Sequence, residues 1–317
     1  MQVWGCLQIQ GLGVTLTNQS LSITNILGKK KSGAGNIYTD TIGMSKIFVN
    51  ISSYKDSQLI PTIKDCIEKA KFPENIYFGV SEQDDEHNLE LDKISNLKFI
   101  FTHFKNGKGQ GWHRNQLYKY LYDGQEYCLM IDSHSRFAKN WDEKYITALN
   151  SRPHKTILTG FPPHYGFDES YKTYTERKHN TYNIPVNIGA CYEVDGKGVF
   201  NDMPFRETAV VSAANIFSTG EFTQITLYDE YLNPFREQEI ICCLAFQYGY
   251  KVEVMRDALI WHCYYNNLPG SKEKYRTLPS EEIRITGYEN CFVPLLNKRD
   301  TPHSATEWTQ HILKFKQ

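Results

Sequence analysis

A short apolar run that ends in three polar residues is the strongest constraint in this sequence. Tyr127–Ile131 have apolar side chains or stems, as in a buried β-strand, and Asp132, Ser133 and His134 follow directly. Side chains two positions apart in an extended chain point the same way, so Asp132 and His134 could bind one metal ion. A carboxylate and an imidazole suit manganese or a related divalent ion. Because open α/β sheets bind nucleotides at the carboxyl ends of their strands, the run predicts a metal-assisted, nucleotide-dependent enzyme.

Segments typical of strands and helices alternate around this run. Strands are expected at residues 46–51, 75–80, 97–104, 126–131, 155–160 and 252–261, and helices at 59–70, 114–122 and 234–250. This alternation predicts an α/β fold with a doubly wound, mostly parallel sheet. Residues 161–210 are rich in Pro, His, Tyr and Asn and are expected to form long loops, so the second half should be irregular.

The chain divides into three parts by pattern. Residues 1–43 show little periodicity and are expected to be a flexible arm or a non-native upstream extension. Residues 44–267 carry the α/β pattern and form the expected catalytic domain. Residues 268–317 have weak periodicity and several charges, and we expect a packed C-terminal tail.

Charge and cysteine usage narrow the classes of partner and compartment. The net charge is −1, so no overall basic field would attract nucleic acid or anionic lipid. No run approaches the ~20 apolar residues of a membrane span, and the start of the chain lacks the pattern of a signal peptide. The eight cysteines form no CxxC pair, which argues against structural zinc. Several lie in apolar runs as expected for buried thiols, which predicts a reducing, cytoplasmic location.

The order of several motifs resembles a known family. The segments that carry the resemblance are Val49–Asp56, Ile76–Gln83, Leu121–Phe137 and Asn140–Asp142, with Arg114 upstream of the third. Together they resemble the GlcNAc-transferase family that includes the cytoplasmic enzyme modifying hydroxyproline on an adaptor subunit of SCF ubiquitin ligases. That family is similar to the polypeptide GalNAc-transferases, which share Asp-Ser-His. The match spans roughly residues 46 to 265 and is more specific than any single motif.

The resemblance implies a GT-A glycosyltransferase fold and a UDP-sugar donor, UDP-GlcNAc above all. It also implies a divalent cation, Mn²⁺ or a relative such as Mg²⁺, and transfer with retention to a hydroxyl on a protein or glycan. By the same similarity Asp132 and His134 would be metal ligands, with His262 as the third. Alternatively, His262 is a histidine packed at the end of a strand.

The resemblance also points to residues around the donor. Arg114 would reach the diphosphate or the uridine, since guanidinium suits phosphate; the alternative is a solvated arginine on a helix. Ser52, Tyr54 and Gln83 lie at the ends of the first two expected strands, where a GT-A fold seats uridine. Tyr54 could equally be an aromatic residue of a loop.

An acidic pair in the second half is a candidate for catalysis. The family has a Gly-Glu-Glu-type run here, but in this chain Gln238 separates Glu237 from Glu239 and no Gly precedes them. Either carboxylate would orient the acceptor or support positive charge on the sugar ring. The alternative is that both stabilise the start of a helix.

Two other functions remain open on the sequence. The interrupted acidic pair is compatible with a non-catalytic member that binds a sugar nucleotide or a glycan. A metal-dependent nucleotidyltransferase also uses carboxylates at strand ends. Release of UDP, of pyrophosphate, or of neither distinguishes these from a glycosyltransferase.

Overall fold

The computed structural model describes residues 44–167, 174–175, 181–182, 203–225, 237–264 and 300–313. The expected arm, residues 1–43, lies outside these residues, as does most of the expected tail. The strands are β1 (Ile47–Tyr54), β2 (Ile76–Asp84), β3 (Leu97–His103), β4 (Tyr127–Asp132), β5 (Ser135–Phe137), β6 (Thr156–Thr159), β7 (Gly166–Phe167), β8 (Tyr174–Thr175), β9 (Phe205–Thr208), β10 (Asn215–Thr219), β11 (Lys251–Met255) and β12 (Ile260–His262). The α-helices are α2 (Leu59–Lys69), α3 (Gln110–Tyr120), α4 (Trp141–Asn150), α5 (Glu221–Ile225), α6 (Glu237–Gln247) and α10 (Ala305–Leu313), and short 3-10 turns occur at Pro73–Asn75, Leu91–Lys93 and Phe104–Asn106.

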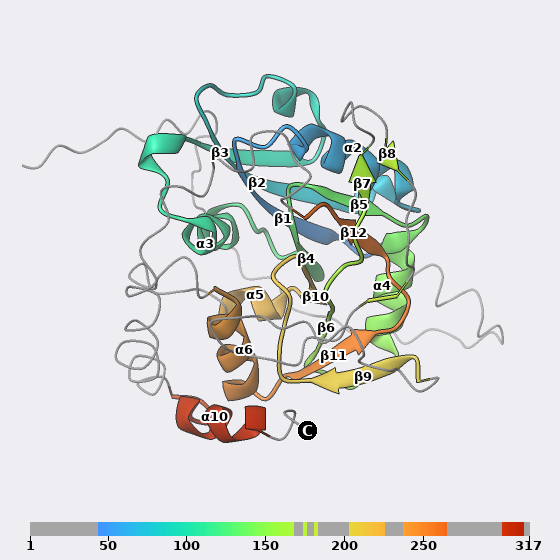
Figure 1. The fold of residues 1–317 in the computed structure, drawn as a ribbon, viewed down its shortest axis with the longest axis vertical. Coiled ribbons are helices and arrows are strands. Elements are labelled where there is room, and N and C mark those ends of the chain that lie inside the picture. Colours follow the sequence, from blue (N-terminus) through green and yellow to red (C-terminus); the bar gives the residue numbers. More distant parts are fainter. Residues whose placement is uncertain are drawn as a thin grey trace, which may run out of the picture.

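The described strands form one large mixed sheet in the order β3-β2-β1-β4-β10-β6-β11-β9 (Figure 1). Strands β3, β2, β1 and β4 are parallel neighbours, and β6 pairs parallel with β11. Strand β10 runs antiparallel between β4 and β6, and β9 is an antiparallel edge strand. The predicted α/β class with a mostly parallel sheet is therefore confirmed.

Alternation along the central strands gives the sheet two apolar faces. In β4, Leu129 and Ile131 join a buried cluster with α2 and α4, whereas Cys128 and Met130 join a second cluster with α3, α5 and α6. Figure 1 shows α4 and the pair α3 and α6 on opposite sides of the sheet. Side chains alternate between the two faces along a strand, so Asp132 lies on the same face as Cys128 and Met130. This is the face that α3 and α6 cover.

Helix α10 extends the second apolar layer. It packs on α6, and its Trp308 is fully buried in the cluster that includes Ile241 and Leu244. At its start Ser304 Oγ accepts the N–H of Glu307 while the Glu307 carboxylate accepts the N–H of Ser304, a reciprocal capping box. None of the helices in the described ranges has the length and apolar character that a membrane span needs.

The expected strand at 252–261 is wrong in one respect, because the chain leaves the large sheet within it. Residues 251–255 form β11 beside β6, and residues 260–262 form β12, which pairs antiparallel with β5 in a separate two-stranded sheet. The charged pair Arg256-Asp257 interrupts the apolar residues between the two strands, and the chain bends at Arg256 and again at Leu259. The charged pair coincides with the change of sheet, and the expected strand ran across it.

Part of the expected loop region also differs. Residues 205–208 form β9, and β7 and β8 form a short hairpin. Within residues 161–210, the structure describes only 161–167, 174–175, 181–182 and 203–210. Strand β10 completes the centre of the sheet.

Candidate metal centre

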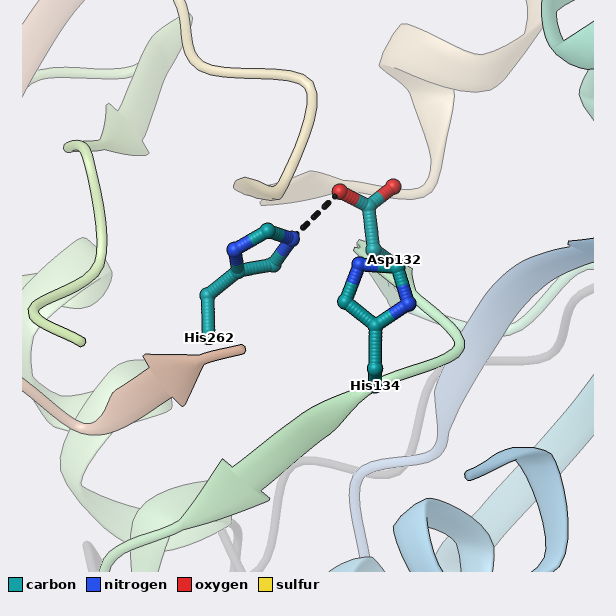
Figure 2. Close-up of side chains that lie close together, drawn as sticks. All are labelled: Asp132, His134 and His262. Atoms are coloured by element: carbon teal, nitrogen blue, oxygen red, sulfur yellow. Dashed lines mark hydrogen bonds and ion pairs between the residues drawn. The ribbon is translucent and has the colours of Figure 1, made fainter. Parts of the chain in front are cut away.

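Three polar side chains meet beyond the end of β4. Asp132, His134 and His262 each offer a ligand atom, and these atoms all lie within 4.8 Å of one another. Figure 2 shows the carboxylate of Asp132 above the two imidazole rings, with a hydrogen bond to His262. All three residues are buried, with relative exposures of 9%, 4% and 3%. The structure therefore brings together the three residues that the resemblance marked as ligands.

The convergence depends on a bend and on one strand pairing. Strand β4 ends at Asp132, residues 133–134 form a bend, and β5 begins at Ser135. The expectation that Asp132 and His134 lie on one extended strand is therefore wrong, since the bend is what turns both toward the same point. The β5–β12 register places His262 opposite Ser135, next to His134 in the chain.

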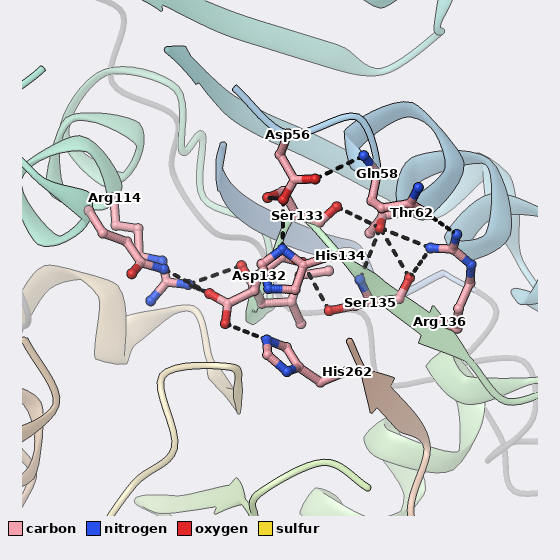
Figure 3. A network of polar contacts seen from close by, with 12 residues as sticks. Asp56, Gln58, Thr62, Arg114, Asp132, Ser133, His134, Ser135, Arg136 and His262 are labelled. Atoms are coloured by element: carbon pink, nitrogen blue, oxygen red, sulfur yellow. Dashed lines mark hydrogen bonds and ion pairs between the residues drawn. The ribbon is translucent and has the colours of Figure 1, made fainter. Parts of the chain in front are cut away.

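The hydroxyl of Thr62 holds the bend from the side of α2. Thr62 Oγ1 donates to the carbonyl of Ser133 at 2.8 Å and accepts the N–H of Ser135 at 3.0 Å. The Ser135 hydroxyl in turn donates to the carbonyl of Asp132 at 2.9 Å (Figure 3). Because Thr62 is fully buried on a regular helix, the polypeptide around the ligands is positioned by the packed core.

Asp56 orients His134. The Nδ1 of His134 lies 2.6 Å from Asp56 Oδ2, which also accepts the Ser133 hydroxyl at 2.7 Å (Figure 3). A carboxylate at Nδ1 fixes the tautomer and leaves Nε2 as the ligand atom, an arrangement common at metal-binding histidines. Asp56 was not expected at the site from the sequence. Its only signal was its place at the end of the Val49–Asp56 motif.

Arg114 connects Asp132 to α6. Its Nη2 donates to Asp132 Oδ1 at 2.6 Å, and its Nη1 donates to Glu237 Oε2 at 3.0 Å. Arg114 is fully buried, so the alternative of a solvated helix arginine is wrong. Gln110 adds a second donor to Asp132 Oδ1 at 2.7 Å, and no sequence pattern pointed to this contact.

The protonation states suit metal binding. Burial would raise the pKa of the Asp132 carboxyl, but the hydrogen bond from His262 and the charge of Arg114 outweigh it and hold that pKa well below its usual range. Burial and the neighbouring His134 lower the pKa of His262. Asp132 is therefore a carboxylate and His262 a neutral imidazole, which are the forms that bind metals.

The donor set fits a divalent cation. The guanidinium of Arg114 pairs with the buried carboxylates of Asp132 and Glu237, and the carboxylate of Asp56 pairs with His134, so carboxylates outnumber guanidinium groups in direct contact with the ligands. Buried charge is costly unless it is compensated, and a divalent ion would supply the missing charge. One carboxylate and two imidazoles are ligands that Mn²⁺ and related ions accept.

The other expected residues lie at the ends of β1 and β2 or at the start of α6. Gln83 and Ser52 are buried, and Gln83 Nε2 donates to Ser52 Oγ at 3.3 Å. Tyr54 is half-buried and contacts Phe104 edge to face. Glu237 is buried against Arg114, whereas the side chain of Glu239 lies outside the described residues. The structure therefore brings Glu237 into the ligand cluster and leaves Ser52, Tyr54 and Gln83 as a neighbouring group.

Known structures share this architecture. Residues 1–349 of TarS from S. aureus, solved with UDP-GlcNAc, match with a TM-score of 0.51 at 13% identity over 85% of this chain and 71% of that one. A longer TarS structure matches with a TM-score of 0.50 at 14% identity, over 85% of this chain and 42% of that chain. GalNAc-T7, solved with UDP, GalNAc and Mn²⁺, gives 0.49 at 15% identity, over 69% of this chain and 44% of that one. This chain thus spans less than half the length of two of these proteins.

The large sheet and its helices have the GT-A fold of the TarS structures, and a family match gives the protein class as a glycosyltransferase. The family described as glycosyltransferase (GlcNAc) matches residues 46–98 and 87–277, which is most of the chain, and the protein belongs to that family. No curated protein matches the chain.

Proposed function

We propose that this protein transfers GlcNAc from UDP-GlcNAc to a hydroxyl acceptor, with a divalent cation and with retention of the anomeric configuration. The observation that carries the proposal is the convergence of Asp132, His134 and His262 at the end of β4, in a chain of the glycosyltransferase (GlcNAc) family. The complex of TarS with UDP-GlcNAc supports the choice of donor for this fold.

In this proposal Asp132, His134 and His262 hold Mn²⁺, or Mg²⁺ in its place. The bound cation would neutralise the negative charge that the leaving UDP gains as the bond to the sugar breaks. Asp56 keeps His134 in the ligating tautomer, and Arg114 with Gln110 fixes the rotamer of Asp132. Ser52, Tyr54 and Gln83, at the ends of β1 and β2, would seat the uridine.

The roles of Arg114 and Glu237 follow from their burial. Arg114 is enclosed between two carboxylates, which favours a role in positioning Asp132 over direct capture of phosphate from solvent. Glu237, committed to Arg114, would act on the site through that guanidinium. Glu239 remains the other candidate for a carboxylate that faces the acceptor. The acceptor is a hydroxyl of a protein or glycan, and the buried thiols of Cys66, Cys128 and Cys263 support a cytoplasmic location.

The test is metal-dependent turnover of UDP-sugars. Purified protein is incubated with UDP-GlcNAc and Mn²⁺, with UDP-GalNAc, UDP-glucose and UDP-galactose in parallel, and UDP release is measured. We expect the fastest release from UDP-GlcNAc, with loss of activity on chelation. NMR of the first product anomer formed tests retention, and mass spectrometry of modified proteins and glycans identifies the acceptor.

Two variants sharpen this test. Asp132→Asn removes the charged ligand while keeping the shape of the side chain, and UDP release should fall by at least about 100-fold. Asp142→Asn is the matched control, because Asp142 is also a buried aspartate but accepts the N–H groups of Lys71 and Phe72 at the start of α4. Tight UDP binding without turnover would instead identify a sugar-nucleotide binder, and release of pyrophosphate would identify a nucleotidyltransferase.

A further inference from the structure

The strand that carries His262 is too short to hold its own position. β12 has three residues and pairs with a three-residue strand, β5. Isolated two-stranded pairs are at best marginally stable in water. His262 also lies 130 positions from Asp132 in the chain, so its place in the site depends on the bonds of its own N–H and C=O to Pro163 and Tyr165 and on the contacts that anchor the entry to β12.

One hydroxyl group supplies two of the contacts that anchor that entry, beside the bond from the Ala138 N–H to the carbonyl of Leu259 at 2.9 Å. The oxygen of Tyr182 accepts the N–H of Leu259 at 2.9 Å and the N–H of Ile260 at 3.0 Å. Neighbouring N–H groups of a regular strand point in opposite directions, so two of them can share one acceptor only where the chain bends. This is the bend that takes the chain out of the large sheet and into β12.

The Tyr182 hydroxyl is itself held by the core. It lies 2.5 Å from the hydroxyl of Tyr145 on α4, and Tyr145 donates to Asn215 Oδ1 on β10 at 2.8 Å. Because the single proton of Tyr145 goes to Asn215, Tyr182 must donate to Tyr145. Asn215 Nδ2 then reaches the carbonyl of Gly160 at 3.4 Å. The chain of donors runs in one direction, from Tyr182 to the centre of the large sheet.

We propose that Tyr182 and Tyr145 are positioning residues of the metal centre, which place His262 by fixing the bend at Leu259 and Ile260. This inference rests on the proposed metal-dependent function. Both tyrosines are buried, and burial raises the pKa of Tyr182 to about 12, so its hydroxyl remains protonated and able to donate. Tyr182 is also tied to the bend through its own N–H, which donates to the carbonyl of Arg256 at 3.0 Å.

The chain offers a matched control. Tyr127 is buried in the same apolar cluster, stacks on Phe217 as Tyr145 does, and donates its hydroxyl proton to Asn150 Oδ1 at 2.9 Å. None of the hydrogen bonds of its hydroxyl that the structure describes leads to β12. Tyr127→Phe therefore removes the same chemical group from the same core without touching the proposed relay.

The experiment measures Mn²⁺ affinity and amide hydrogen exchange in the wild-type protein and in Tyr182→Phe, Tyr145→Phe and Tyr127→Phe. Tyr182→Phe should weaken Mn²⁺ binding about tenfold, the lower end of the effect of residues that orient ligands. The amides of Leu259 and Ile260 should exchange at least about tenfold faster in the metal-free variant. Tyr145→Phe should show both effects in smaller measure, and Tyr127→Phe neither.

The two readouts separate this inference from the proposed function. If the wild-type protein binds no Mn²⁺, the proposed metal site fails, and exchange at Leu259 and Ile260 still decides whether Tyr182 holds the bend. Unchanged exchange in Tyr182→Phe overturns the relay. Faster exchange together with wild-type Mn²⁺ affinity also overturns it, because the hydroxyl would then support the fold without placing His262. If Tyr182→Phe does not fold, Tyr145→Phe, which leaves the Tyr182 oxygen in place, supplies the same comparison.

Discussion

At the scale of single residues, Arg114 has the strictest requirements of any side chain in the site. Its two terminal nitrogens serve different carboxylates, Asp132 on β4 and Glu237 on α6, and one of them also donates to the carbonyl of Ile131 at 3.1 Å. Only the planar fork of a guanidinium offers donors in this arrangement. Arg114 therefore keeps Asp132 ionised and in the orientation that metal binding requires, although Arg114 itself need not touch the metal.

Replacing Arg114 by alanine should leave two buried carboxylates without their counter-charge. We expect the free energy of unfolding to fall by about 3–5 kcal/mol, the usual cost of breaking a buried ion pair from one side. Urea denaturation in the presence of chelator measures it. Arg152→Ala is the control, because Arg152 binds Glu253 with two nitrogens but is partly exposed, and its loss should cost about 1 kcal/mol. Equal costs for the two variants would contradict the role given to Arg114.

At the scale of elements, helix α3 is attached to the sheet by polar as well as apolar contacts. His113 Nδ1 lies 2.8 Å from Ser81 Oγ on β2, while its Nε2 accepts the N–H of Lys108 at 3.4 Å. One nitrogen donates and the other accepts, so the ring is neutral in the folded protein. His113 is fully buried on the helix that carries Arg114.

This neutral histidine makes stability depend on pH. Burial lowers the pKa of His113 to about 4, whereas the unfolded chain has an ordinary pKa near 6.5. Below about pH 6.5 His113 is protonated in the unfolded chain but stays neutral in the folded protein. The free energy of unfolding therefore falls as the pH falls toward 4. Between about pH 7 and about pH 5 the loss should reach about 2 kcal/mol.

Urea titrations at both pH values, on the wild-type protein and on His113→Asn, measure this contribution. The variant should lose less stability on acidification by about the same 2 kcal/mol. His154→Asn is the control, because His154 is exposed and should leave the pH dependence as it is in the wild-type protein. If His113→Asn and the wild-type protein show equal pH slopes, His113 does not carry the effect.

At the scale of the whole molecule, the proposed metal centre joins parts of the chain that are distant in sequence. Asp132 and His134 leave the first half of the large sheet, and His262 arrives on β12 after the chain has crossed β10, β6 and β11. The packed layers on both faces of the sheet bring these pieces together. A cation bound there would cross-link the two halves in the folded state alone.

Metal binding should therefore stabilise the whole fold. With Mn²⁺ at about 100 times its dissociation constant, the free energy of unfolding should rise by about 2.7 kcal/mol, and chelation should reverse the increase. Thermal unfolding with and without Mn²⁺ measures it. Asp132→Asn should abolish the increase and Asp142→Asn should keep it. A rise of the same size in Asp132→Asn would place the metal elsewhere.

Local pattern was enough to find the strands β1, β2, β3, β4, β6 and β11 and the helices α2, α3 and α6. The spacing of apolar residues in β1, β2, β3, β4 and β6 reflects burial on both faces of the sheet. Each pattern lies within the few residues of one strand, so a short stretch of sequence is enough to detect it. The motif resemblance likewise placed Asp132, His134 and His262 in one expected ligand set, and the structure brings these three together.

Long-range packing decided what those residues contact. The bend after β4 depends on Thr62 of α2, the tautomer of His134 depends on Asp56, and the place of His262 depends on strand pairing across more than a hundred positions. Asp56 and a buried Arg114 look in sequence like a loop carboxylate and a solvated helix residue, because neither periodicity nor spacing encodes a partner from another element. Burial and pairing of charge are properties of the assembled layers, so only the tertiary structure could assign them.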